Sequence, residues 1–429
     1  MSRFFKVSGI SLPELRGFRS RLPFYSVYFL AFANAMGLLT LMTLLPTYID
    51  LLEPSGIVIG LFVTGVTLAQ GVAIVPYGWA GDRYNKQRLL LVGIAICGIA
   101  YVLFAFVTTS AGFVGVRFIQ GLGVVGVGLL SLAFVSEIAP EEDRAVTIGK
   151  YNAWRLFGGL LGAVGAGVVF ERYGFETVFG ILVVLFVVAI LSTWRYTTPD
   201  SSSIGFSFGK LALNRRIMTL ISFRSQYAFA VTMARNWVPI FAGVSAVQGG
   251  LGFTAAVVGL VIAAEQFTNM VCQPFTGKLS DRFGRARFVF FGGVTYGLVA
   301  VVVPLTPRIG ELIGLTYTYP YLGELPGMFL VLIGLNALLG VADSFREPAS
   351  MALFADVGNA EGGITSSFGI RNLVWQPGSI VGPLIAGWIM VEVGMEWVFY
   401  LAGGLAISGA ITFLGILVYT HGRGGLSQW

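Results

Sequence analysis

Charge and histidine are both scarce in this sequence. Of its 429 residues, 11% are charged and 56% are hydrophobic, whereas soluble domains carry about 25% charged residues. His421 is the single histidine, which argues against clustered histidine ligands for a metal and against histidine-based catalysis. The composition therefore predicts a protein that is not an enzyme, uses no cofactor, binds no metal and does not expose most of its surface to water.

Cysteine is equally scarce, and the basic residues do not gather into one patch. Cys97 and Cys272 both lie within apolar runs, so we expect two packing residues and no disulfide framework. The net charge of +6 comes from Lys and Arg residues in short clusters between apolar runs. This scatter argues against a nucleic-acid partner and points to membrane topology as the origin of the charge.

Long apolar runs are the main feature of the chain. A helix that crosses a bilayer needs about 20 mainly apolar residues. The stretches of this kind are 24–49, 56–80, 88–108, 112–138, 145–170, 177–197, 216–243, 252–279, 288–306, 326–355, 364–391 and 397–420. The sequence therefore predicts an all-α polytopic protein with twelve transmembrane helices and the lipid bilayer as its surroundings.

The basic residues fall on one side of this predicted topology. If the N-terminus is cytoplasmic, the inside segments hold nineteen Lys and Arg residues and the outside segments hold only Arg172 and Arg308. Cytoplasmic loops of membrane proteins carry such an excess of positive charge. We therefore expect an integral protein of the cell membrane with both termini in the cytoplasm and residues 1–21 as a cytoplasmic tail.

The chain is predicted to consist of two similar halves. A Ser-rich segment after the sixth span suggests a half at 1–197, a cytoplasmic linker at 198–215 and a second half at 216–429. Two loops match at a spacing of 199 residues, where Gly78, Asp82, Arg83 and Arg88 recur as Gly277, Asp281, Arg282 and Arg287. A second set matches at a spacing of 220 residues, where Gly149, Asn152, Gly162, Gly167, Gly174, Glu176 and Phe179 recur as Gly369, Asn372, Gly382, Gly387, Gly394, Glu396 and Phe399. Transporters are often built from such repeats around a central site, and the change in spacing places an external insertion near residues 308–326.

The two matching loops carry a recognisable pattern. They read GWAGDRYNKQR at 78–88 and GKLSDRFGRAR at 277–287. Both resemble the signature loop of the major facilitator superfamily, in which three residues separate a Gly from Asp-Arg and a Gly-Arg-x-Arg ending follows. Asn85 departs from the family Gly, and we expect a positive φ both at Gly284 and at Asn85, because asparagine tolerates that conformation. The resemblance implies that these loops act as gating elements, which latch the cytoplasmic side when the protein opens outward.

The fourth and fifth spans extend the resemblance over nearly the whole chain. Arg117, Gln120, Gly121 and Gly123 match the family's Arg-x-x-Gln-Gly-x-Gly motif. The resemblance implies twelve helices in two pseudo-symmetric halves, a cavity between them and a monomer. In span five the proline of the family's drug-proton antiporters is replaced by Ala163, so the antiporter signature is degraded. The small residues of this span are predicted to serve helix packing.

Charged residues within the spans are candidates for the functional site, because an ionisable group costs at least about 2.5–3.5 kcal/mol at the bilayer centre and usually faces a cavity or a partner. These residues are Arg117, Arg155, Arg224, Arg235, Glu265, Asp343, Arg346, Glu347 and Arg371. None lies in spans three, six, nine or twelve, which the resemblance makes peripheral. Together they predict a polar cavity between the halves.

Specific roles follow from position and residue type. Glu265, near the middle of span eight, is the first candidate for proton coupling, because burial favours the protonated carboxyl. Its alternative role is that of a permanent partner for a cavity arginine. Asp343 and Glu347 are the other proton-coupling candidates, although Asp343 and Arg346 can equally form a local ion pair. Arg224 and Arg371 are expected to extend towards the cytoplasmic surface. The residues predicted to line the substrate cavity are Arg155, Arg346, Arg117, Arg235, Asn34, Asn152 and Asn372.

The leading hypothesis is a secondary active transporter that exports a small organic solute by alternating access and is coupled to protons. The alternative is uptake or exchange of an organic anion through an arginine-lined cavity, with Arg155 and Arg346 as its contacts. A remote alternative is a membrane receptor that uses the fold without transport. Fold does not fix the substrate, so the sequence leaves its identity open.

Overall fold

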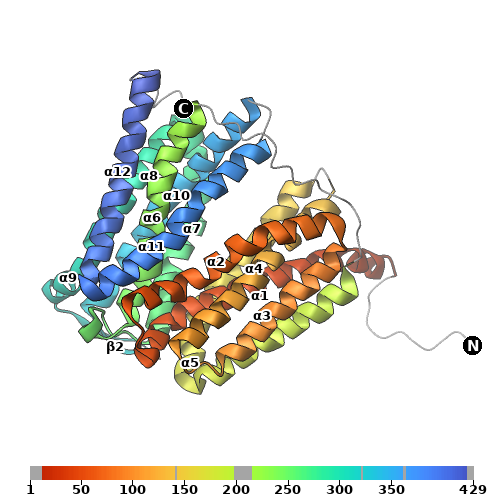
Figure 1. The fold of residues 1–429 in the computed structure, drawn as a ribbon, viewed down its shortest axis with the longest axis horizontal. Helices are drawn as coiled ribbons and strands as arrows, with labels where there is room; N and C mark the ends of the chain where they lie inside the picture. The colour runs from red at the N-terminus through yellow and green to blue at the C-terminus, as the bar shows by residue number, and fades with distance from the viewer. Residues whose placement is uncertain (1–11, 141–142, 198–214, 320–321, 361–363, 423–429) are drawn as a thin grey trace, which may run out of the picture.

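The structure is a computed structural model that describes residues 12–140, 143–197, 215–319, 322–360 and 364–422. Most of the predicted linker and the first eleven residues lie outside this part. The helices are α1 Leu12–Leu52, α2 Gly56–Arg83, α3 Lys86–Phe104, α4 Ser110–Ile138, α5 Arg144–Tyr196, α6 Arg215–Gly243, α7 Ala255–Phe283, α8 Arg285–Val302, α9 Thr306–Ile313, α10 Gly327–Ala360, α11 Ile364–Glu392 and α12 Met395–His421. They form two groups, α1–α5 and α6–α12 (Figure 1).

The helices account for the twelve predicted spans. Ten helices in the described residues are long and apolar enough to cross a membrane. One of them, α5, has 53 residues and turns back on itself at Gly174, where φ is 75° (Figure 1). The 29-residue α6 is not among the ten, because Arg224, Arg235 and other polar residues lower its hydropathy. The two arms of α5 and the addition of α6 together give twelve crossings.

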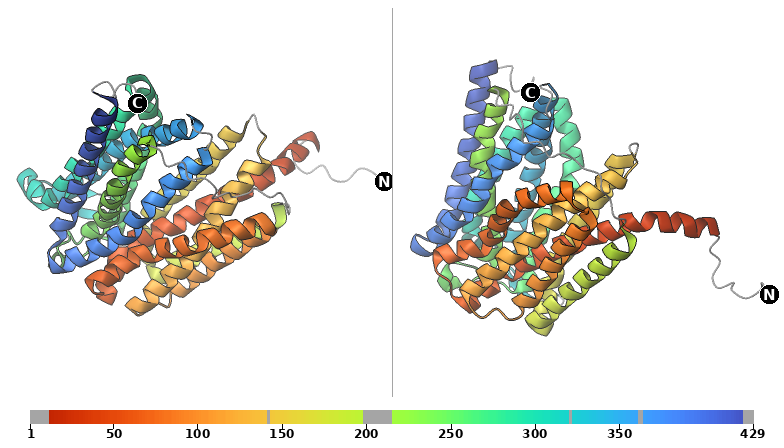
Figure 2. Two further views of the ribbon diagram at one scale, coloured as in Figure 1. Left: turned by 45° about the horizontal axis from the view of Figure 1, so that its top comes forward. Right: turned by 45° about the vertical axis from the view of Figure 1, so that its right-hand side comes forward.

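Two segments differ from the sequence-based expectation. The expected N-terminal tail is already helical from Leu12, and this first part of α1 extends beyond the rest of the bundle (Figure 2). The expected external loop at 308–326 contains α9 and an antiparallel hairpin of β1 (Thr316–Tyr319) and β2 (Gly323–Pro326). The helix α9 and the two strands are too short to show the long apolar run by which a membrane span is predicted.

The two groups of helices repeat the same packing. Gly121 of α4 lies so close to α2 that a Cβ there would be 2.4 Å from the Val66 carbonyl oxygen. Its counterpart in α10, 219 residues later, is Gly340, whose Cβ would be 2.2 Å from the Glu265 carbonyl oxygen in α7. Between α5 and α1, a Cβ at Gly162 would lie 2.3 Å from the Met36 carbonyl oxygen, and between α11 and α6 a Cβ at Gly382 would lie 2.7 Å from Oγ1 of Thr232. Small residues thus allow close helix contact inside each group, as predicted for span five.

Among the described residues, the two groups pack on each other from one end of the bundle as far as the middle of α2, where Thr67 donates to the Ser379 backbone oxygen at 3.3 Å. We call the end where α2 joins α3 and α7 joins α8 the loop end, and the opposite end the far end. At the far end α2 packs on α11, where the Cβ of a residue at Gly387 would lie 2.1 Å from the Gly56 carbonyl oxygen. α5 also packs on α7, where a Cβ at Gly167 would lie 2.3 Å from the Ala255 carbonyl oxygen. Side chains close the far end further, because Gln248 donates to Asp50 at 2.9 Å.

Towards the loop end the groups diverge (Figure 1). A side chain at Gly71 or Gly78 of α2 would meet no atom within 4 Å. The apolar side chains of Val72, Val75 and Trp79 on the same stretch are exposed. The described conformation is therefore closed at the far end and open at the loop end.

Enlarging the glycine at the α2–α11 contact should open the far end. In Gly387→Leu the new side chain collides with backbone atoms of α2, and overpacking of this kind costs about 1–3 kcal/mol. That cost corresponds to a shift of about 5–150-fold in the equilibrium between closed and open far ends. Spin labels at the exposed Leu51 and Val247 would report longer distances by double electron–electron resonance.

The matched control for this prediction is Gly165→Leu in α5, where a side chain meets no atom within 4 Å. Its distance distribution should equal that of the wild type. An unchanged distribution in Gly387→Leu would contradict the proposed contact.

Candidate functional site

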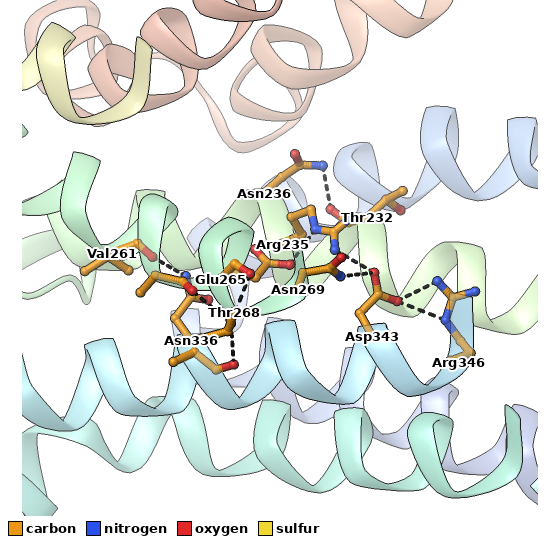
Figure 3. A network of polar contacts seen from close by, with 12 residues as sticks. Thr232, Arg235, Asn236, Val261, Glu265, Thr268, Asn269, Asn336, Asp343 and Arg346 are labelled. Carbon is orange, nitrogen blue, oxygen red and sulfur yellow. Dashed lines mark hydrogen bonds and ion pairs between the residues drawn. The ribbon is translucent and has the colours of Figure 1, made fainter. Parts of the chain in front are cut away.

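A network of charged side chains lies inside the second group of helices (Figure 3). Arg235 of α6 is at its centre: its Nε donates to Oε1 of Glu265 at 2.7 Å, and its Nη2 donates to Oδ2 of Asp343 at 2.9 Å. Asp343 also binds Arg346, whose Nη2 lies 2.5 Å from Oδ1. Two carboxylates from α7 and α10 thus share their charge with two arginines, which makes the network neutral overall.

The two acids of this network differ in their surroundings. Asp343 is 1% exposed and contacts two arginines. It also accepts hydrogen bonds from Asn269 at 3.3 Å and from Tyr227 at 3.4 Å. This environment stabilises the ionised carboxylate, because each of its oxygens accepts charge-assisted hydrogen bonds.

Glu265 has fewer partners. It is 5% exposed, and its one ion pair is with Arg235. The hydroxyl of Tyr296 in α8 is buried and has no hydrogen-bond partner among the described residues. The side chain of Arg235, which pairs with Glu265, is 41% exposed and also lines a pocket.

Next to this network lies a pocket of about 200 Å³. Residues from α6, α10 and α11 form its walls: Arg224, Arg235, Asp343, Arg346, Glu347, Arg371, Asn372 and Trp375. Four arginines and two acids therefore face one small space. The expectation that Arg224 and Arg371 extend to the surface is wrong, because they are only 5% and 7% exposed.

Arg224 and Arg371 have weaker partners than the central network offers. Nε of Arg224 donates to the backbone oxygen of Arg371 at 2.6 Å, and the guanidinium lies 4.8 Å from the ring centroid of Trp375. Arg371 approaches Glu347 at 3.9 Å, and its Nε is buried without a hydrogen-bond partner. These two arginines are therefore short of negative charge and of acceptors.

The equivalent positions in the first group are uncharged. The contacts between glycines and neighbouring helices define the correspondence: α1 to α6, α2 to α7, α4 to α10 and α5 to α11 are offset by 196, 199, 219 and 220 residues. By these offsets Arg224, Arg235, Glu265, Asp343, Arg346 and Arg371 correspond to Tyr28, Leu39, Val66, Val124, Val127 and Tyr151. The shared packing therefore does not require the charges.

Arg117 lies away from the pocket. It is buried in the first group, where its Nε donates to the Phe62 backbone oxygen at 2.8 Å and its Nη1 donates to Gln120 at 2.9 Å. Its counterpart Asn336 makes the same kind of bond to the Val261 backbone oxygen. The geometry assigns Arg117 a contact between α4 and α2, and Arg117 does not line the pocket of the second group.

The other predicted cavity residues are spread over both groups. Asn372 lines the pocket. Arg155 is exposed one turn from Gly159, which faces Gln266 of α7, and it does not line that pocket. Asn34 is partly buried with an oxygen that has no hydrogen-bond partner, and Asn152 is partly buried.

The two signature loops lie at the loop end. The guanidinium of Arg83 lies 4.4 Å from the ring centroid of Trp79, and that of Arg282 lies 5.5 Å from the ring centroid of Phe283. Arg88 and Arg287 are exposed. Asp281 binds Arg285 at 2.7 Å, whereas the side chain of Asp82 lies outside the described part.

The turn geometry of these loops corrects one prediction. Gly284 has φ 102°, as expected. Asn85 has φ −60° and accepts a bond from the Arg88 backbone nitrogen at 3.2 Å. Asparagine therefore serves as the N-cap of α3 and does not replace a glycine with positive φ.

Sequence reasoning missed three neighbours of the site: Tyr227, Asn269 and Trp375. They are uncharged residues within apolar spans, so charge within a span does not identify them. The ring of Tyr227 lies 4.3 Å from the guanidinium of Arg346. For Trp375, the signal was its place one turn after Arg371 on the same helix.

Comparison with known proteins agrees with this architecture. The model of the Major Facilitator Superfamily matches residues 27–244 and 225–426. The multidrug resistance protein MdtG of Proteus mirabilis is 23% identical, covering 90% of this chain and 94% of its own. The quinolone resistance protein NorA of Staphylococcus aureus (strain COL) is 22% identical, with 91% and 95% covered. The staphyloferrin B transporter of Staphylococcus aureus (strain NCTC 8325 / PS 47) is 26% identical, with 67% and 73% covered.

Solved structures share the fold. A crystal structure of the nucleoside transporter NupG superposes with a TM-score of 0.72 at 14% identity, covering 92% of this chain and 99% of that one. The POT family transporter PepTSo superposes with a TM-score of 0.68 at 15% identity, with 94% and 98% covered. Family match, helix count and repeated packing lead to one conclusion: this chain is an integral membrane protein that belongs to the major facilitator superfamily of transporters.

Proposed function

We propose that this protein is a proton-coupled secondary transporter of a small organic solute, with Glu265 as the group that takes up the proton. The observation that carries the proposal is the contrast between two buried acids in one network. Asp343 is held by two arginines, whereas Glu265 has one ion pair and that pair is with the partly exposed Arg235. A buried carboxyl with little compensation favours its protonated form.

Protonation of Glu265 changes what Arg235 can do. A neutral carboxyl binds a guanidinium less strongly than a carboxylate does. Arg235 then keeps its bond to Asp343, while its Nε becomes available to a solute or to the other group of helices. The network also gains one positive charge. Proton uptake by Glu265 is thereby linked to the release of Arg235, which lines the pocket. A coupled carrier requires such a link between the proton and the solute site.

The conformation supports alternating access. If the loop end is cytoplasmic, as the distribution of Lys and Arg predicts, the far-end contacts between α2 and α11 and between α5 and α7 close the outside. The conformation is then inward-facing, and both termini are cytoplasmic. The signature loops are proposed to come together when the loop end closes.

Two directions of transport have support. The names of two relatives, a multidrug resistance protein and a quinolone resistance protein, favour export. The excess of arginine in the pocket favours the second candidate, uptake or exchange of an organic anion. Proton movement driven by lipophilic cations would support the first, and proton movement driven by organic anions would support the second.

Removing the titratable group at 265 should uncouple proton movement. In proteoliposomes with an internal pH dye, a panel of lipophilic cations, sugars and organic anions should include a solute that drives a pH change with the wild type. Glu265→Gln keeps the size and one hydrogen-bond acceptor for Arg235, and it should reduce that pH change to the protein-free background. Exchange of labelled solute across the membrane should persist.

Glu311→Gln in α9 is the matched control, because this exposed glutamate lies outside the network and should leave proton movement unchanged. Full proton movement by Glu265→Gln would remove Glu265 from the mechanism. Solute flux without any pH change in the wild type would overturn proton coupling itself.

Asp343 should matter more for stability than for proton uptake. Asp343→Asn leaves the buried Arg346 without its carboxylate, and breaking a buried pair costs about 3–5 kcal/mol. We expect a large loss of thermal stability in detergent. Asp356→Asn, which removes an exposed partner of Arg285, should cost at most about 1 kcal/mol. Equal melting temperatures for the two variants would refute this division of roles.

A further inference from the structure

Two buried arginines of the pocket lack the negative charge that their neighbours have. In the part of the chain that the structure describes, Arg224 has no carboxylate within ion-pair distance, and its contacts are a backbone oxygen and the ring of Trp375. Arg371 reaches Glu347 only at 3.9 Å and keeps an Nε with no acceptor. We call Arg224 and Arg371 the arginine pair. A buried cation is costly unless it is paired, so the pair fits a ligand that brings negative charge.

The acids nearby are already engaged. Asp343 binds Arg235 and Arg346 through both of its oxygens. Glu347 is 31% exposed and is the one acid in contact with the pair. Two guanidinium groups therefore face one distant carboxylate, which leaves a net positive charge at this side of the pocket.

The repeat shows that the fold does not need these arginines. At the equivalent places of the first group stand Tyr28 and Tyr151, both buried in one apolar cluster. The hydroxyl of Tyr28 donates to the Thr147 backbone oxygen at 3.4 Å, and that of Tyr151 shares a hydrogen bond with Ser131 at 2.7 Å. The same junction of helices is thus built without charge in one half and with two cations in the other.

We infer that the arginine pair binds the anionic group of the transported solute, and that this group is a carboxylate or a phosphate. Guanidinium groups bind both through paired N–H donors. Trp375, which is partly exposed beside the pair in the pocket wall, packs against the apolar part of the same solute. This inference rests on the proposed transport function and assigns its substrate class. It replaces Arg155 and Arg346 as the contacts, since Arg346 is neutralised by Asp343 and Arg155 lies outside the pocket.

The test measures ligand-induced stabilisation of the full chain in lipid nanodiscs. The probes are benzoate, phenyl phosphate, the neutral benzamide and the cationic benzamidine at matched ionic strength. A ligand that binds only the folded state raises the melting temperature with concentration. At least one of the two anions should stabilise the wild type, and which one does so distinguishes a carboxylate site from a phosphate site. Benzamide and benzamidine should have no effect.

The informative variants copy the first half of the protein. Arg224→Tyr and Arg371→Tyr introduce the residues that the repeat already accommodates at these places, so both are expected to fold. In each variant, the anion concentration needed for the same rise in melting temperature should be at least ten times that of the wild type. Arg224→Lys should show a smaller increase, because it keeps the positive charge. Arg155→Gln is the control outside the pocket and should respond as the wild type does.

The inference would be overturned if neither anion stabilises the protein, if benzamidine alone does, or if the tyrosine variants respond like the wild type. These outcomes are separate from those for proton coupling. Anion binding without any proton movement would leave the arginine pair in place and remove the proposed coupling. If only cations drive proton movement in the wild type, and Glu265→Gln loses that movement, the proposed coupling stands and the arginine pair is not the solute site.

Discussion

The ion pairs around Arg235 are the interaction on which the charged pocket of the second group depends. A charged side chain among apolar helices is tolerated only when it is paired or faces water. Arg235 meets both conditions: it binds Glu265 and Asp343, and its side chain is 41% exposed. Because one cation links acids from two other helices, α6, α7 and α10 are held together by a neutral network. Its neutrality depends on Glu265 being ionised, so a single proton changes both its charge and its contacts.

The contacts between the two groups of helices differ from the ion pairs around Arg235. Inside a bilayer, apolar surface gains little by leaving lipid for protein, and helix association relies on close packing of small residues. At the far end the groups meet through Gly56 with Gly387 and through Gly167 with Ala255. These glycine contacts are made mainly by backbone atoms and small side chains. The ion pairs around Arg235 lie within the second group, so the glycine contacts between the groups do not include them.

Periodicity and charge were sufficient to predict the membrane fold but not the site. The spans, the repeat and the signature loops are patterns in the sequence itself, so the sequence alone predicts them. The pairing of Asp343 with Arg346, three residues apart, was also foreseeable. The link from Arg235 to Glu265, 30 residues away, was one of several pairings that the sequence allowed. The burial of Arg224 was predicted wrongly, because depth along a helix does not tell which face the side chain occupies.

The charges of the site also determine the sign of any coupling. Glu265 pairs with Arg235 of α6, which also binds Asp343 of α10 and lines the pocket. Protonation of Glu265 removes one negative charge beside the pocket and so favours an anion at the arginine pair. By linkage, a bound anion favours the proton to the same extent. Ligands that help each other to bind cross the membrane together, whereas a cationic solute would compete with the proton and exchange for it. An anion at the arginine pair therefore implies symport, and export of cations by exchange would require a solute site elsewhere in the cavity.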